Sequence, residues 1–273
     1  MASQDSGSQS VIKAFAVLDL IAASGAAGIT LSDASKHLSV SKSTAYRYLA
    51  TLQKLGAVER DEKDSFHLGL KILELDGALI RHTRLIQMSW PIMKELARLT
   101  EETVHLAMPW RGEMMYVVKV DSARPIGLGA RNGTRAPMYC TATGKAILAR
   151  DRNGRWLKQV LARGLEARTP TTITSPEDLI RELEQIRTRG YAMDSQEYEL
   201  SVCGVGAAIL DHSRNPVGAI SVTGPASRMS QERWDKIGNW VREAALDISG
   251  QMGYTAPRSE LVPAAVWSVT DTV

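Results

Sequence analysis

The N-terminal part of the chain is organised around Val40-Ser-Lys-Ser-Thr-Ala-Tyr-Arg-Tyr-Leu-Ala-Thr-Leu-Gln-Lys-Leu-Gly56. Ser41 can cap a helix here, and apolar residues follow at spacings of three and four until Gly56, a typical helix stop. Upstream, Thr30-Leu-Ser-Asp33 has the pattern of a capping box and predicts a shorter helix over 32–38. With a tight turn at Ser39–Val40 between them, the two helices form a helix-turn-helix, in which the second helix contacts DNA.

The first turn of the second helix is rich in short donors and cations, the groups that bond phosphates and base edges. We therefore predict that it contacts DNA through Lys42, Ser43, Thr44, Tyr46 and Arg47. Spacing alone does not separate this interpretation from an ordinary helical hairpin with a solvated basic end. A predicted hairpin over 57–68, with a polar turn at Asp61–Asp64, completes a winged helix and places Arg60 beside the flanking DNA.

Composition limits the class of protein. The 273 residues suit two domains, and a net charge of +3 excludes a polycation, although positive charge gathers between residues 31 and 60. Two cysteines provide no disulfide framework and indicate a reducing cytoplasm. The sequence has no signal-peptide pattern, and no apolar run reads as long enough to span a bilayer. We expect a soluble cytoplasmic protein without a membrane partner.

The pattern along the chain predicts an α+β protein of two domains. A disordered tail over 1–9 is followed by the winged helix-turn-helix over 10–69 and by a helix over 70–88, whose apolar stripe indicates a linker that packs against a second subunit. Pro91 predicts the start of a new helix, and strands dominate from Thr103 onward. The second domain is expected over 89–253, before a loose tail over 254–273.

Several segments, in this order and spacing, resemble the IclR family of bacterial transcriptional regulators. Besides 40–56 they are Phe66-His-Leu-Gly-Leu-Lys-Ile-Leu-Glu-Leu75, Glu102-Thr-Val-His-Leu106, Ala136-Pro-Met-Tyr-Cys-Thr-Ala-Thr-Gly-Lys-Ala-Ile-Leu-Ala149, Arg189-Gly-Tyr-Ala-Met-Asp194 and Ala219-Ile-Ser-Val-Thr-Gly-Pro225. The resemblance implies a winged helix-turn-helix, a dimerising linker helix and a GAF-like effector domain, in which a curved antiparallel sheet holds a small organic ligand. It also implies a homodimer, or a dimer of dimers.

The resemblance places the ligand at the backbone amides of Ala142 and Thr143. Amides at a helix start are a ready anion site, so a carboxylate is chemically suitable, although threonines there can also act only as helix caps. The resemblance adds Asp194, which can stand beside a carboxylate only if it is protonated or accepts a bond from the ligand. The remaining implied pocket residues are an apolar wall and two hydroxyls that share one face of a strand: Leu128, Ser221 and Thr223.

One departure from the family pattern affects Cys203. Aligned without gaps, Cys203 occupies the position of the family's arginine, and Gly204 occupies that of its pocket-facing cysteine. A shift of one residue reverses the face of a sheet. Either Cys203 points away from the ligand or a bulge restores it, and we keep it as a candidate pocket residue.

Two other functions remain to be separated. The chain could be an enzyme with Cys203 as nucleophile and His105 or His212 as base, but no diagnostic spacing, phosphate loop, nucleophile elbow or metal-ligand pattern accompanies them. It could also bind DNA without any ligand. The polar groups at 141–143, 194 and 221–223 favour a regulator, expected to be a repressor of a catabolic operon controlled by a small carboxylate or oxo-acid, without cofactor or metal.

Overall fold

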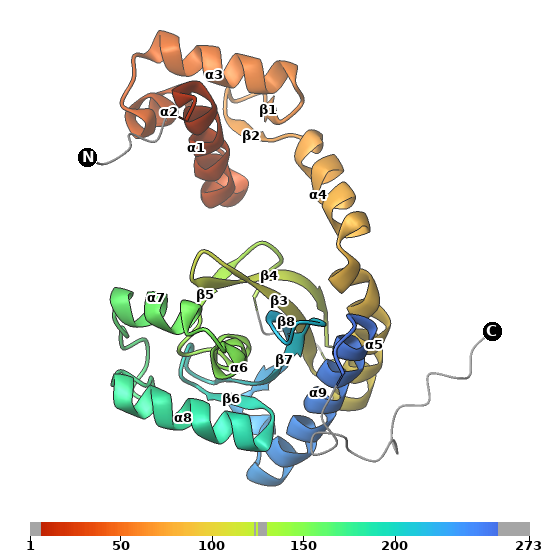
Figure 1. Ribbon diagram of the computed structural model, residues 1–273. Coiled ribbons are helices and arrows are strands. Elements are labelled where there is room, and N and C mark those ends of the chain that lie inside the picture. Colours follow the sequence, from red (N-terminus) through yellow and green to blue (C-terminus); the bar gives the residue numbers. More distant parts are fainter. Residues whose placement is uncertain (1–6, 123, 125–129, 256–273) are drawn as a thin grey trace, which may run out of the picture. The chain divides into compact units, whose positions relative to one another are not determined.

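The computed structural model describes residues 7–122, 124 and 130–255 (Figure 1). The chain divides into two compact units, Met1–Thr83 and Arg84–Val273, which are described separately. The predicted tails fall largely outside the described residues. At the N-terminal end, a helix already begins at Gln9.

The first unit has the predicted winged helix-turn-helix. Its elements in chain order are α1 Gln9–Ser24, α2 Leu31–Leu38, α3 Lys42–Lys54, β1 Val58–Arg60, β2 Phe66–Leu68 and α4 Leu70–His82. The predicted capping box is confirmed, since Thr30 Oγ1 accepts from the Asp33 amide and Asp33 accepts from the Thr30 amide. Ser39 adopts the left-handed conformation, with φ of 52°, in the tight turn. Strands β1 and β2 pair antiparallel as the wing.

The expectation that no apolar run could span a bilayer is wrong by length and composition. The segment Gln9–Ala27 has 19 residues and a mean hydropathy of 1.6. It overlaps α1, whose residues Val17 and Ile21 are buried in the core of the first unit with Leu49 of α3 and Phe66 of β2. Part of its apolar surface therefore packs within this unit, while Val11, Ile12 and Phe15 are exposed.

The predicted linker helix over 70–88 is interrupted. Helix α4 ends at His82, because Thr83 leaves the helical conformation and its hydroxyl donates to the Leu79 carbonyl at 2.7 Å. The predicted helix start at Pro91 is also wrong, since Pro91 lies inside α5, Arg84–Thr100. Pro91 is exposed to solvent, while the opposite side of α5 is buried, for example at Met93 and Leu96. This burial offsets the roughly 3 kcal/mol that an interior proline costs.

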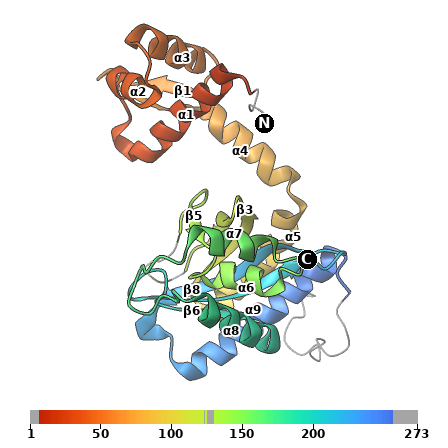
Figure 2. The same ribbon diagram turned by 60° about the vertical axis from the view of Figure 1, so that its left-hand side comes forward.

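The second unit contains a six-stranded antiparallel sheet in the order β5-β4-β3-β8-β7-β6. The strands are β3 Thr103–Trp110, β4 Glu113–Val120, β5 Arg135–Pro137, β6 Ala192–Ser195, β7 Val202–Leu210 and β8 Pro216–Pro225. The helices that follow α5 are α6 Ala142–Arg150, α7 Arg155–Arg163, α8 Pro176–Arg189 and α9 Gln231–Gln251. Figure 2 shows the same sheet and helices from a second side. The predicted α+β class with an antiparallel effector-type sheet is confirmed.

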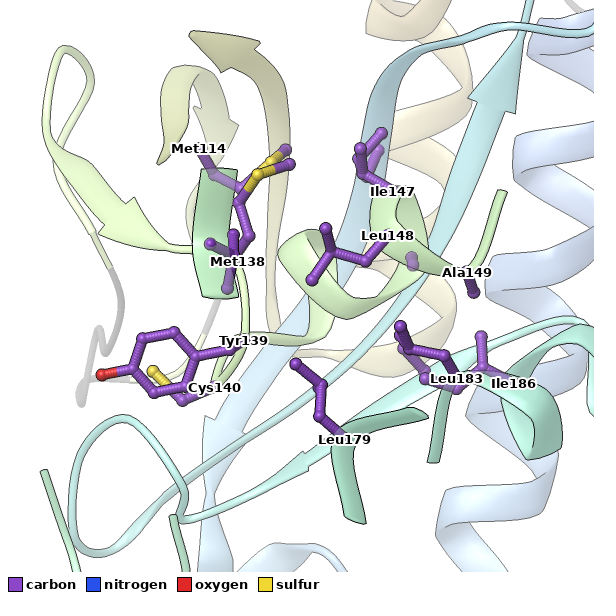
Figure 3. Packing of buried hydrophobic residues seen from close by; sticks show 14 of the residues in the cluster. Met114, Met138, Tyr139, Cys140, Ile147, Leu148, Ala149, Leu179, Leu183 and Ile186 are labelled. Carbon is purple, nitrogen blue, oxygen red and sulfur yellow. The ribbon is translucent and has the colours of Figure 1, made fainter. Parts of the chain in front are cut away.

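Helix α6 is the core of the second unit. Every residue from Ala142 to Ala149 is buried, and the helix packs between the sheet and α8. In Figure 3, Leu148 of α6 lies among Met138, Leu179 and Leu183, which come from the preceding loop and from α8. Small residues let the backbones approach closely. A Cβ on Gly144 would lie 2.3 Å from both the Cα and the carbonyl oxygen of Met138.

Replacing Gly144 by alanine tests this packing. We expect Gly144→Ala to lower the free energy of unfolding by about 3 kcal/mol or more, because the Met138 backbone has to move. Gly250→Ala is the matched control, since Gly250 is also helical and a Cβ there meets nothing within 4 Å. The control should raise the free energy by about 0.5–1 kcal/mol. Equal effects in chemical unfolding would contradict the close approach at Gly144.

Candidate functional site

The first turn of α3 presents the side chains that the sequence predicts for DNA contact. Ser41 caps the helix by accepting from the Thr44 amide, and its hydroxyl also contacts those of Ser43 and Thr44 at 2.9 and 3.0 Å. Four of the predicted side chains are exposed and Thr44 is half-buried; the exposed four are Lys42, Ser43, Tyr46 and Arg47. Neither cation pairs with a carboxylate among the described residues, so both are available to a phosphate or a base.

Arg60 lies in the wing, and its surroundings differ from those of the α3 cations. It pairs with Asp64 at 2.9 Å, and its guanidinium lies 5.4 Å from the centre of the Phe66 ring. Across the hairpin, His67 contacts Asp61 at 3.0 Å, and Asp61 also accepts from the Ser65 amide. These contacts order the wing, so Arg60 would have to leave Asp64 to contact DNA.

A cavity of about 220 Å³ lies at the N-terminal end of α6 in the second unit. Five of the predicted ligand-binding residues line it: Ala142, Thr143, Asp194, Ser221 and Thr223. The strand register explains how they meet, because Ser221 is opposite Gly206 and Thr223 is opposite Gly204, which is itself opposite Asp194. Three adjacent strands therefore bring their side chains to one face. The predicted roles of these residues in binding remain predictions.

Two backbone donors point to an anion. Among the described residues, the amides of Ala142 and Thr143 make no hydrogen bond, whereas the next two amides bond to Thr141. Gly206 lets this helix start approach the sheet, since a Cβ there would lie 3.0–3.1 Å from the Ala142 carbonyl group and the Thr143 nitrogen. Free amides at a helix N-terminus, in a cavity, form an anion site.

Asp194 is poised between its charged and neutral forms. Burial, and then the neighbouring Glu197 carboxylate, raise its pKa to about 7. Asp194 Oδ1 accepts from the Glu197 amide at 2.7 Å, which fixes the orientation of the carboxyl group. The protonated form can donate a hydrogen bond, so Asp194 can stand beside a ligand carboxylate at neutral pH without repelling it.

His105 and Tyr116 also line the cavity, and sequence reasoning missed both as ligand contacts. Their rings contact edge to face, with centroids 5.2 Å apart. The Ala130 backbone is the hydrogen-bond partner within reach of buried His105, without good hydrogen-bond geometry, and burial lowers the pKa of His105 to about 4. The Thr143 hydroxyl lies within reach of that of Tyr116, its one nearby partner in the described part of the chain, again without good hydrogen-bond geometry. Buried polar groups without a well-formed hydrogen bond are rare unless a ligand or a water molecule bonds them.

A local irregularity in the sheet positions Tyr116. The register shifts between Leu106 and Ala107, so that Tyr116 pairs with Ala107 and Val118 pairs with Leu106. One residue of β4 is thereby skipped, and Tyr116 joins the face that carries His105. The two-residue period of a strand places His105 on the same face as Thr103 and Ala107, so the sequence could have assigned His105 to this face. No sequence signal marks the shift that brings in Tyr116.

The prediction that Cys203 faces the pocket is wrong. Val202 and Gly204 line the cavity and Cys203 does not, because adjacent residues of β7 alternate between the two faces of the sheet. The register around Cys203 is regular, so no bulge restores it. Burial raises the pKa of its thiol to about 11, the reverse of an activated thiolate. The other uncertain position, Leu128, lies outside the described residues.

A buried ion-pair network lies behind the cavity. Lys145 of α6 is only 1% exposed, and its Nζ lies 2.5 Å from Glu197 and 3.7 Å from Glu182 of α8. Glu182 also pairs with Arg189 at 2.6 Å. Lys145 therefore links α6 to the segment that follows Asp194 through its ion pairs. The described residues contain no group of three His, Cys, Asp or Glu side chains suited to a metal.

Comparisons with known proteins agree over nearly the whole chain. The IclR helix-turn-helix domain matches residues 10–62, and the bacterial transcriptional regulator IclR C-terminal domain matches residues 77–250. The transcriptional regulator KdgR of Escherichia coli K12 is 36% identical over 90% of this chain and 93% of its own length. The transcriptional repressor AllR of the same organism is 31% identical over 92% of both chains. The crystal structure of Thermotoga maritima IclR superposes with a TM-score of 0.75 at 32% identity, covering 89% of this chain and 98% of that one.

Proposed function

The chain belongs to the IclR family of bacterial transcriptional regulators, and we propose that it is a repressor of a catabolic operon, controlled by a small carboxylate or oxo-acid effector. The observation that carries the effector proposal is the cavity at the start of α6. There the free amides of Ala142 and Thr143 lie beside buried side chains that lack a well-formed hydrogen bond. The name of the relative AllR supports the choice of a repressor.

Operator binding is assigned to α3 and the wing. The cations Lys42 and Arg47 are five residues apart in α3 and have no carboxylate partner in the described chain, beside the exposed Ser43 and Tyr46. Arginine can bond the major-groove edge of guanine in bidentate fashion, whereas lysine and hydroxyl groups bond phosphates. Arg60 is proposed to contribute a weaker contact from the wing, because it already forms an ion pair with Asp64.

The DNA assignment predicts a large loss on removing both free cations. Arg47→Ala alone should cost about 1–3 kcal/mol of operator affinity if Arg47 reads a base in bidentate fashion. Lys42→Ala with Arg47→Ala should abolish binding at moderate salt in an electrophoretic or fluorescence-anisotropy assay. Lys94→Ala with Arg98→Ala removes the same charge from exposed positions of α5 and is the control. Operator binding that survives the Lys42 and Arg47 changes would show that α3 is not the reading helix.

Assembly into a homodimer, or a dimer of dimers, is proposed from α4. None of its residues is buried, yet four of its leucines are more than half exposed: Leu70, Leu73, Leu75 and Leu79. Large apolar side chains exposed together on one helix mark an interface. A symmetric dimer would bind an operator with inverted repeats.

Sedimentation tests the assembly. At micromolar concentration we expect a species of at least twice the 29.8 kDa chain mass, because burying the exposed leucines of α4 in an interface is favourable. Leu73→Glu with Leu79→Glu should shift the population toward the monomer, since burying the new charges costs free energy. Replacing the exposed Ile180 of α8 by Glu is the control. A wild-type chain that sediments only as a monomer would remove this proposal.

The pocket chemistry favours an anion that carries a second polar group. The amides of Ala142 and Thr143 suit a carboxylate, while Asp194, Ser221 and Thr223 suit a hydroxyl, carbonyl or hydrated aldehyde at the other end. A hydrocarbon would leave these groups unpaired, which costs roughly 1–3 kcal/mol for each one. Binding that favours one arrangement of the effector domain would change operator affinity through α4 and α5.

Two alternatives are less well supported. A DNA-binding protein without ligand would leave His105 and Thr143 buried with only poorly formed hydrogen bonds, which is costly. An enzyme using Cys203 would need a thiolate near a base, but Cys203 faces away from His105 across the sheet.

The effector proposal is tested by calorimetry with small hydroxy- and oxo-acids first selected by thermal shift. Ser221→Ala with Asp194→Ala should weaken effector binding while operator binding by the free protein persists. Ser213→Ala with Asp247→Ala makes the same changes at exposed positions and is the control. Full effector affinity and full control of DNA binding in the Ser221 and Asp194 double variant would place the pocket elsewhere.

The effector affinity measured by calorimetry should depend on pH. Because the pKa of Asp194 is raised to about 7, wild-type affinity for an anionic effector should fall as the pH rises through neutrality, when Asp194 becomes charged. Asp194→Asn stays neutral and should lack this fall. An unchanged pH profile in that variant would contradict the role of Asp194 as a donor.

A further inference from the structure

A second cavity lies at the opposite end of α6 from the effector pocket. It has a volume of about 500 Å³, within the range of small-molecule sites. Its wall is formed by the C-terminal end of α6, the turn after it, α8 and the β7–β8 turn: Ala149, Arg150, Asp151, Arg152, Arg187, Leu210, Arg214 and Tyr254. We call it the arginine groove, since four of these eight residues are arginines.

The positive charge of the groove is not balanced by its own wall. Asp151 is the only acid in the lining, and its Oδ2 accepts from the Trp156 and Leu157 amides at 2.6 and 3.1 Å, where it helps to start α7. Within the described chain, no carboxylate pairs with Arg152, Arg187 or Arg214. Arg187 Nε donates to the Ala149 carbonyl at 2.9 Å, which fixes the plane of its guanidinium group.

An adjoining smaller cavity adds a fifth guanidinium group. It has a volume of about 120 Å³ and shares Arg150, Arg187 and Leu210 with the arginine groove. Arg242 of α9 lines it, and Arg242 Nε is buried without a hydrogen-bond partner among the described residues. Arg242 Nη1 donates to the Arg189 carbonyl at 3.4 Å, so the guanidinium is held in place while its buried Nε–H remains available to an anionic acceptor.

We propose that the arginine groove binds a small, multiply charged anion, a phosphate ester or a polycarboxylate, as a second ligand separate from the effector. Guanidinium groups bond both chemistries in bidentate, charge-assisted pairs. Like charges gathered from separate elements repel one another, and a single multivalent anion would satisfy several of them at once. The proposal does not depend on the identity of the effector.

The experiment uses the full chain, with pyrophosphate and citrate as probes, in calorimetry at about 150 mM salt, where weak surface attraction is screened. We expect saturable binding of at least one probe. Arg187→Ala with Arg214→Ala should weaken it by about tenfold to a hundredfold, the loss of charge-assisted bonds. Tighter binding of pyrophosphate would identify a phosphate ester as the ligand class, and tighter binding of citrate a polycarboxylate.

Two controls locate the site. Arg98→Ala with Arg181→Ala removes two exposed arginines outside the groove, and Lys42→Ala with Arg47→Ala removes the free cations of α3. Both should leave probe affinity unchanged. Arg214→Glu, at an exposed turn, is a second groove variant that avoids disturbing Arg187, and it should also weaken binding. Absence of saturable binding, full affinity in both groove variants, or equal losses in the controls would overturn the proposal.

Discussion

The seating of α6 against the sheet is the constraint on which the second unit depends. The helix is buried on all sides, and glycines at the contacts allow its backbone to lie against Met138 on one side and β7 on the other. A buried helix must have its terminal amides satisfied by some partner. Those of Gly144 and Lys145 bond to Thr141, whereas those of Ala142 and Thr143 face the cavity. The packing that stabilises the unit therefore also leaves two amides for the proposed anion site.

The charges around α6 follow from the same burial. Lys145 cannot be buried without a counter-charge, and Glu197 and Glu182 provide it. Glu197 in turn contributes to raising the pKa of Asp194, so the ion pair behind the pocket influences the charge inside it. At the far end of α6 the balance is different, because arginines from α6, α8 and the β7–β8 turn meet with little acid among them. One short helix thus borders two cavities: one is lined by backbone amides and Asp194, and the other by arginines.

In the first unit, the two features that bear on function are the exposed surfaces of α3 and α4. Ser41 caps α3 while its neighbours Lys42 and Ser43 are exposed, so the turn that stabilises the helix also exposes the donors proposed to contact DNA. The exposed leucines of α4 are the surface proposed to contact a second subunit. Membership of the IclR family is consistent with both features.

Local signals in the sequence determined the helix starts and stops. The caps at Thr30, Ser41 and Ser175 and the stop at Gly190 are set by neighbouring residues, and the structure has each of them. The family resemblance identified five residues that line the cavity. Tertiary structure alone decided the rest. Pro91 sits inside a helix because that helix buries its other face, Tyr116 enters the pocket through a shift of strand register, and Cys203 leaves it because β7 stays regular. These outcomes depend on pairing and burial between segments far apart in the chain, which no local pattern of residues encodes.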